Sequence, residues 1–139
     1  MIKKILFILL IGFGFSCSNQ QKEKQEERKK DGTPPKIEFD KLYYDFGTIT
    51  QGEKVAYSFT FKNTGGTDLI IKDAIASCGC TVPDYNTKPV APGEKSSVEI
   101  IFDSRGRLGN QYKSIILKTN TPYGKKTLTI KANIVTNKN

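Results

Sequence analysis

The feature that most constrains the fold is a strict two-residue alternation of apolar and polar side chains in short segments. It is clearest at 54–62, where the alternating apolar residues are Val55, Tyr57, Phe59 and Phe61. A period of two residues places successive side chains on opposite faces of a β-strand. The segment therefore predicts a strand with one face in a core and the other in water.

The same alternation recurs along the chain from residue 37 onward, interrupted by turn-forming Gly, Pro, Asn and Asp residues. No segment of useful length has the 3.6-residue period of a helix. The predicted strands cover 37–39, 43–46, 54–62, 69–76, 96–103, 111–119 and 126–135. About seven strands in about 100 residues are typical of an all-β, immunoglobulin-like antiparallel β-sandwich, and we predict this fold for 37–136.

Residues 1–16 predict a lipoprotein signal peptide. Lys3 and Lys4 precede an apolar run that ends at Ser16, immediately before Cys17, which is the arrangement of a secretory signal. The run is shorter than the roughly 20 residues that a membrane-spanning helix requires. A small residue before the cysteine resembles a bacterial lipobox, so Cys17 is the predicted lipidation site. The alternative is a plain signal peptide, cleaved nearby, that leaves Cys17 free.

Residues 17–36 are predicted to form a flexible, disordered tether between the lipid and the sandwich. This stretch is rich in Lys, Glu and Gln and has no large apolar side chain, so it cannot offset the entropy lost on ordering. Ser18 does not resemble the acidic residue that retains lipoproteins in the inner membrane. The predicted location is therefore the cell envelope, with the outer membrane favoured.

Composition argues against nucleic-acid binding and against catalysis. The formal net charge is +8, or +6 once Lys3 and Lys4 leave with the signal, and basic residues do not gather with aromatic residues on one predicted face. We expect this basic surface to lie near anionic lipid headgroups. The chain has no His, so a Ser-His-Asp or Cys-His arrangement cannot form within it. We predict a protein that is not an enzyme and needs no cofactor.

The pair Cys78 and Cys80, with Gly79 between them, has chemistry that packing alone does not predict. Three interpretations stay open: a structural or partly buried thiol or disulfide turn, an envelope thiol-redox pair, and a metal-capture site. Catalytic redox pairs usually have two intervening residues and lie at a helix start, although a disulfide across so short a loop should be easily reduced. A metal site lacks other soft ligands, because the chain has no His and its one Met is Met1.

The loop at 104–110 holds Arg105 and Arg107. A guanidinium group binds carboxylates and other anions through paired N–H donors. The two arginines therefore form a candidate partner-binding loop, and a solvated hairpin loop is the alternative.

Three landmarks carry a resemblance to a known family. They are "YYDFGTITQGEKVAYSFTFKNTGGTDLII" from Tyr43, "SCGCTVP" from Ser77, and "KPVAPGEKSSVEIIFDSRGRLGNQYKSIILKTN" from Lys88. Together they resemble the domain-of-unknown-function family 1573 of exported bacterial proteins, over roughly 37–135. The resemblance implies a sandwich similar to major-sperm-protein and hydin-type domains, and no known catalytic activity. Within the first landmark, Asn63 and Gly65 are expected to take positive φ angles.

The sequence thus predicts a lipid-anchored cell-envelope protein whose sandwich is a binding or scaffolding module for a protein partner. We expect recognition at strand edges and loops near 77–85 and 104–110. The alternative from another class is a thiol-redox or copper-handling protein that acts through Cys78 and Cys80.

Overall fold

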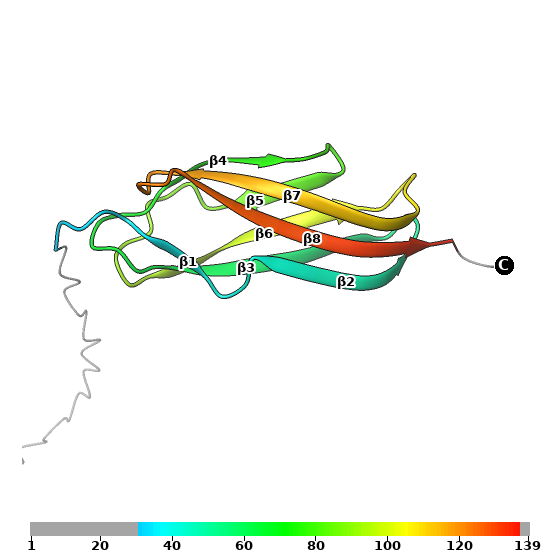
Figure 1. The fold of residues 1–139 in the computed structure, drawn as a ribbon, viewed down its shortest axis with the longest axis horizontal. Helices are drawn as coiled ribbons and strands as arrows, with labels where there is room; N and C mark the ends of the chain where they lie inside the picture. The colour runs from blue at the N-terminus through cyan, green and yellow to red at the C-terminus, as the bar shows by residue number, and fades with distance from the viewer. Residues whose placement is uncertain (1–30, 137–139) are drawn as a thin grey trace, which may run out of the picture.

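The computed structural model describes residues 31–136, which form eight β-strands in two packed sheets (Figure 1). The strands are β1 (Ile37–Phe39), β2 (Tyr43–Thr50), β3 (Lys54–Asn63), β4 (Ile71–Ala76), β5 (Thr81–Tyr85), β6 (Lys95–Asp103), β7 (Gly109–Thr119) and β8 (Lys125–Val135). One sheet has the order β1-β3-β6-β5 and the other the order β2-β8-β7-β4. The described residues contain no helix, and the predicted all-β sandwich is confirmed.

The core lies between the two sheets and consists of the apolar residues that the alternation selects. In β3, Phe59 and Phe61 are each 1% exposed, and in the neighbouring β6, Val98 and Ile100 are fully buried. Phe59 lies opposite Val98 in the β3–β6 register. The alternate residues of β8 are buried in the same way: Leu128, Ile130, Ala132 and Ile134. Burying one large apolar side chain contributes about 1.5–3 kcal/mol, so these residues hold the two sheets together.

Strand β5 is an element that the sequence analysis missed, which is why the strand count is eight and not seven. It contains Pro83 and Asp84, two residue types that are depleted in strands. Because β5 pairs only with β6 and lies at a sheet edge, the missing N–H of Pro83 is tolerated there. The predicted start of β4 was also too early, since Leu69 instead forms a separate bridge with Val90.

Strand β2 corrects the expectation of a purely antiparallel sandwich, because it pairs with β8 in parallel. The chain crosses from β1 in one sheet to β2 in the other without reversing its direction. Strand β2 therefore keeps the direction of β1, which is also the direction of β8. The register shifts between Asp45 and Thr48. Gly47 supplies the positive φ of 71° at this bulge, and its N–H donates to Asp45 Oδ1 at 2.8 Å.

Asn63 and Gly65 do not take the positive φ angles that were expected of them. Asn63 is fully buried, and its Nδ2 donates to the carbonyl oxygens of Thr67 at 2.8 Å and Val90 at 2.9 Å. Gly65 is needed for space, because a Cβ there would collide with the backbone of Pro34 and the residues after it. The start of the described chain, at 34–36, is therefore packed closely against the β3–β4 connection, which corrects the expectation of a flexible tether up to residue 36.

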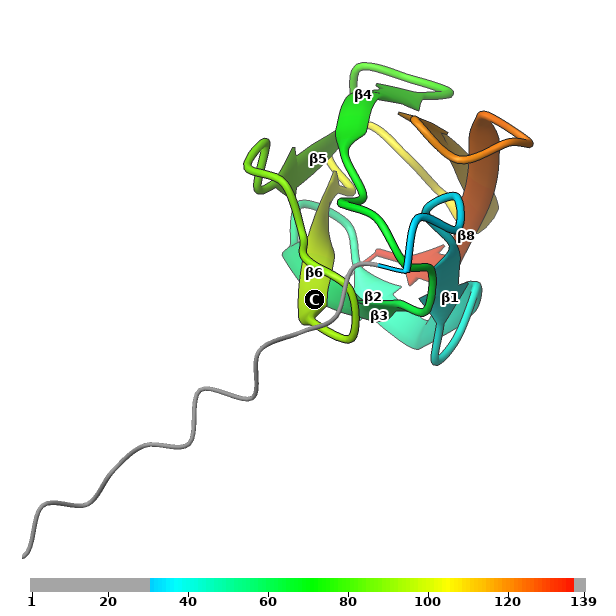
Figure 2. The same ribbon diagram turned by 90° about the vertical axis from the view of Figure 1, so that its left-hand side faces the viewer.

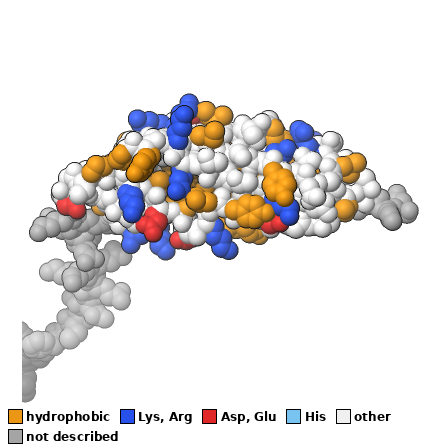
Figure 3. Space-filling view, viewed as in Figure 1, with side chains coloured by type: hydrophobic (Ala, Val, Ile, Leu, Met, Phe, Trp, Pro, Cys, Tyr) orange, Lys and Arg blue, Asp and Glu red, His pale blue; other side chains and the backbone are white. Residues whose placement is uncertain are grey.

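The sandwich has two distinct ends, because its strands run along the long axis of the molecule (Figures 1 and 2). The start of the described chain and the β7–β8 hairpin lie at one end, which we call the N-terminal end. The β4–β5, β6–β7 and β2–β3 turns lie at the other end, which we call the disulfide end. On the face shown in Figure 3, apolar side chains are scattered among basic side chains and do not form one continuous patch.

Candidate functional site

The structure joins Cys78 and Cys80 by a disulfide, with a Cα–Cα distance of 5.3 Å. The pair lies where the chain crosses from one sheet to the other, between β4 and β5. Both cysteines are partly buried, and Cys80 packs against the core. The hydroxyl of Thr81, which is only 3% exposed, lies 3.5 Å from Cys78 Sγ.

This disulfide turn is held by strands of both sheets. The N–H of Ser77 donates to the carbonyl oxygen of Ser114 in β7 at 2.9 Å, and the carbonyl oxygen of Cys80 accepts from the N–H of Asp103 in β6 at 2.9 Å. Gly79 has an ordinary φ, and a Cβ at this position would meet open space. The turn is therefore fixed by its flanking residues, and the backbone conformation does not require glycine at its centre.

The β6–β7 loop is fixed to the β2–β3 turn by Ser104, a residue that the sequence analysis did not single out. Ser104 is fully buried. Its Oγ lies 2.7 Å from the carbonyl oxygen of Glu53 and 3.1 Å from that of Thr50, and it accepts from the N–H of Gly52 at 2.9 Å. A serine between two strands carries no distinctive sequence signal, so this role could not be predicted.

Asp103 and Arg105 form a close pair at the start of the same loop. The Nε of Arg105 donates to both carboxylate oxygens of Asp103, at 3.0 and 2.9 Å, and Nη2 donates to Oδ2 at 2.6 Å. The side-chain and backbone N–H groups of Arg105 lower the pKa of Asp103 to about 2, and Lys54 at 3.8 Å adds a smaller effect. Much of the charge of Arg105 is thus balanced within the chain.

Arg107 differs from Arg105 in the hydrogen bonding of its side chain. Its Nε is buried and has no hydrogen-bond partner among residues 31–136. The backbone of Arg107 is held on both sides, because its N–H donates to the Ser104 carbonyl oxygen at 3.1 Å and its own carbonyl oxygen accepts from Gln51 Nε2 at 3.1 Å. Burial, together with the charge of Arg107, lowers the pKa of nearby Lys113. This corner therefore has an excess of positive charge and a buried donor without an acceptor.

The two candidate features meet in one hollow at the disulfide end. A shallow depression of about 370 Å³ is lined by Gly79, Cys80, Asp103, Arg105 and Arg107. The structure therefore brings together the disulfide and both arginines, although they lie more than twenty residues apart in the sequence. The sequence predicted each feature separately and gave no signal for their contact.

The chemistry of the hollow suits an anionic group. A carboxylate in the hollow would lie beside the guanidinium of Arg107, and charge-assisted hydrogen bonds between these groups are stronger than neutral ones. Leu108, which follows Arg107, is 55% exposed and offers an apolar contact beside the charge. Together the two side chains provide what a protein–protein contact commonly uses, an arginine and an exposed apolar group.

The disulfide bears on how a metal ion could bind at Cys78 and Cys80. Metal ions bind cysteine as thiolate, and the two sulfurs are bonded to each other. Within the described part of the chain, no three His, Cys, Asp or Glu side chains are grouped so that they could hold a metal ion. Copper or zinc capture at Cys78 and Cys80 would first require reduction of the disulfide.

The predicted lipidation site, Cys17, lies outside the described residues, as do the predicted signal peptide and most of the predicted tether. Among residues 31–136, no helix has the length and hydropathy needed to cross a membrane. Cys17 therefore stays a prediction from the sequence.

Comparison with known proteins gives a family match over the whole sandwich. A family model described as "Protein of unknown function (DUF1573)" matches residues 37–134. None of the curated proteins compared with the chain matches it in sequence.

Solved structures share the fold. A protein of unknown function from Porphyromonas gingivalis W83 has a TM-score of 0.63 at 18% identity, over 71% of this chain and 46% of that one. A PapD-like domain of human CEP192 has a TM-score of 0.62 at 12% identity, over 76% and 89%. The VesB protease of Vibrio cholerae has a TM-score of 0.55 at 20% identity, over 77% and 33%.

At these identities the likeness concerns the fold alone. The chain spans less than half of the Porphyromonas gingivalis protein and a third of the protease. The shared part is an immunoglobulin-like sandwich, as the strand pattern predicted.

Proposed function

The chain belongs to DUF1573, a family of proteins of unknown function whose model matches residues 37–134, and we propose that its sandwich is a non-catalytic binding module. The module is held in the cell envelope by a lipid on Cys17, with the residues between Cys17 and the packed segment at 34–36 as a tether. It binds a protein partner that presents a carboxylate to the hollow at the disulfide end.

The observation that carries this proposal is the buried Nε of Arg107, which lacks a partner among residues 31–136. A buried donor without an acceptor costs about 1–3 kcal/mol, and a shift of the Arg107 side chain toward a partner carboxylate in the hollow would remove that cost on binding. Because Ser104 and Gln51 hold the Arg107 backbone on both sides, the loop is prepared for binding and loses little further conformational entropy.

Side-chain recognition is favoured here over addition of a partner strand to β5. An added strand needs a row of free N–H and C=O groups along the edge. Pro83 lies in the middle of β5 and has no N–H, which is a known protection of edge strands. The loops of the disulfide end are therefore the better candidate than the strand edge beside them.

A thiol-redox role remains as a second candidate, because Cys80 lines the same hollow as Arg105 and Arg107. Nearby cations stabilise a thiolate and so favour exchange. In such a step, a thiolate of a dithiol partner attacks the Cys78–Cys80 bond and forms a mixed disulfide. The partner's second thiolate then resolves it, so that the partner is oxidised to a disulfide and the two cysteines are reduced to thiols.

A photocrosslinking residue at two exposed positions tests the binding proposal in intact cells. Leu108 lies at the disulfide end and is 55% exposed, and Tyr123 lies at the N-terminal end and is 95% exposed. We expect a discrete protein adduct from position 108 and none of that mass from position 123. The same adduct from both positions, or a protein adduct from position 123 alone, would contradict the placement of the binding site.

A further inference from the structure

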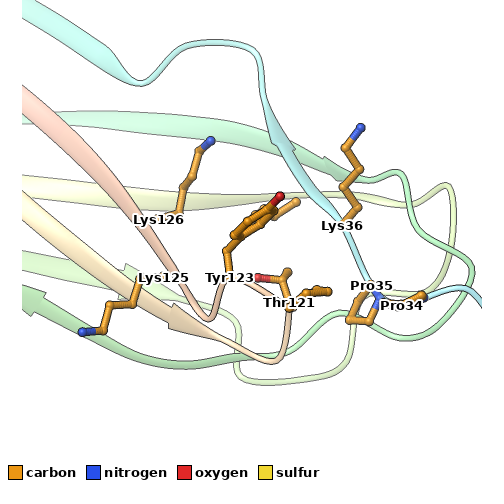
Figure 4. Close-up of a pocket in the computed structure, with 9 residues that line it drawn as sticks. Pro34, Pro35, Lys36, Thr121, Tyr123, Lys125 and Lys126 are labelled. Carbon is orange, nitrogen blue, oxygen red and sulfur yellow. The ribbon is translucent and has the colours of Figure 1, made fainter.

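The N-terminal end of the sandwich carries a groove of about 440 Å³ that the proposed binding site does not use. It is lined by the start of the described chain, at 34–37, and by the β7–β8 hairpin, at 121–126 (Figure 4). These two segments are about ninety residues apart in sequence. The close packing of Gly65 against the backbone at 34–36 holds the first segment against the β3–β4 connection.

The side chains of this groove combine an exposed aromatic ring with the positive charges of lysines. Tyr123 is 95% exposed, and in Figure 4 its ring lies between Lys36 and Lys126, whose side chains point to the same side. Lys125 points away from them. None of the lining residues is acidic, and none of these lysines forms an ion pair with a described residue.

We propose that this groove binds the anionic headgroups of membrane phospholipids. A tyrosine has an apolar ring and a polar hydroxyl, which suits the level of the headgroups, and it is enriched there in membrane proteins. A lysine near an anionic lipid surface contributes about 1 kcal/mol. The lysines thus offer electrostatic attraction to the lipid headgroups, and Tyr123 offers an aromatic ring that can insert among them.

The position of the groove favours a lipid over another anionic ligand such as an acidic glycan. The chain enters the sandwich beside the groove, at residues 31–37. This step rests on the proposed lipid anchor, because a lipid on Cys17 would make the N-terminal end the part of the sandwich nearest to the membrane. An acidic glycan would satisfy the lysines equally but would have no reason to lie at this end.

Lipid binding at the groove would also determine the direction in which the proposed partner-binding site faces. Strands of eleven residues, such as β7 and β8, span roughly 35 Å at about 3.3 Å per residue. With the groove on the headgroups, Arg107 and the disulfide would lie on the side of the domain that faces away from the membrane. A soluble or opposing envelope partner could then reach them.

Lysine footprinting of the full, lipidated chain tests the proposal. The chain is reconstituted into vesicles that contain phosphatidylglycerol or phosphatidylcholine alone, acetylated, and analysed by mass spectrometry. We expect Lys36 and Lys126 to be protected in phosphatidylglycerol vesicles only. Lys54, at the disulfide end and 63% exposed, should react equally in both. Lys126→Gln should lower the protection of Lys36 about fivefold, which corresponds to about 1 kcal/mol, and Lys54→Gln should leave it unchanged.

Several results would overturn the inference. One is equal protection of Lys36 and Lys126 in phosphatidylcholine vesicles. Another is slow acetylation of these lysines without any vesicles, which would indicate that residues 1–30 cover them. A third is protection of the same lysines by an acidic polysaccharide in the absence of lipid. The anchor is judged separately, by whether the chain associates with the vesicles. A chain that associates with both kinds but shows no protection of Lys36 and Lys126 contradicts the groove and leaves the anchor intact. A chain that associates with neither contradicts both.

Discussion

The backbone N–H of Asp103 donates to the carbonyl oxygen of Cys80 over 2.9 Å. This bond joins the disulfide turn to the first residues of the arginine loop, and it continues the β5–β6 ladder, in which Thr81 lies opposite Phe102. A movement of the disulfide turn would therefore displace Asp103, and with it Arg105, whose side chain is hydrogen-bonded to Asp103. The backbone of two neighbouring strands thus connects the parts of the hollow.

Removing the hydroxyl of Ser104 should loosen this end of the domain. Ser104→Ala leaves the N–H of Gly52 and two carbonyl oxygens without their buried partner, and we expect a loss of about 1–3 kcal/mol in the free energy of unfolding. Urea denaturation measures it. Ser97→Ala, at an exposed position of β6, is the control and should stay within about 0.5 kcal/mol of the parent. Equal effects of the two substitutions would refute the role given to Ser104.

The Asp103–Arg105 pair should make stability depend on pH in the acid range. The pKa of Asp103 is lowered from 3.8 to about 2, so its ionised form stabilises the folded state above about pH 3.8, and this contribution is lost as the pH falls toward 2. Asp103→Asn should therefore be less stable than the parent at pH 6, and the two should converge near pH 2. Thermal unfolding at several pH values checks this, and a difference that does not change with pH would count against it.

The disulfide should contribute little to stability. Only Gly79 separates the two cysteines, and a crosslink across so short a loop restrains the unfolded chain weakly, by about 1–2 kcal/mol. Cys78→Ser with Cys80→Ser should therefore fold and should still give the adduct from position 108. If the double variant folds but loses the adduct while the parent oxidises a dithiol protein, the redox alternative is the better account.

The sequence was sufficient for the parts of the fold that depend on alternation. Strands such as β3 and β8 have long apolar faces, and Phe59 and Ile130 are buried as the pattern requires. Strand β5 could not be predicted, because Pro83 is acceptable only at the sheet edge, and edge positions are set by tertiary pairing. The parallel pairing of β2 was missed for a similar reason, since it depends on where the chain crosses between sheets.

The candidate site shows the same limit. The cysteine pair and the two arginines could be selected from the sequence by their chemistry, but the difference between the arginines could not. Arg105 is balanced by Asp103, whereas Arg107 has a buried Nε without a partner in the described residues. That difference depends on side-chain packing, which no local pattern encodes. The groove at Tyr123 was missed because its two segments meet only in the folded domain.

The lipid anchor can be tested by measuring whether the chain is found in the membrane fraction or the soluble fraction of cells. Cys17→Ser removes the thiol that would carry the lipid, and we expect the chain to move from the membrane to the soluble fraction of disrupted cells. Metabolic labelling with a fatty acid should mark the parent and not the variant. A parent that carries no label would contradict the anchor, whatever its fractionation.

The central claim is that Arg107 at the disulfide end receives a carboxylate of a protein partner. The most direct measurement is the yield of the position-108 adduct in cells that carry Arg107→Gln or Lys95→Gln, two substitutions that remove one positive charge each. Lys95 is exposed at the opposite end of β6. A hydrogen bond to a charged group contributes about 1.5–3 kcal/mol, so we predict a loss of roughly tenfold or more for Arg107→Gln and none for Lys95→Gln. An adduct yield that Arg107→Gln leaves unchanged would contradict the account.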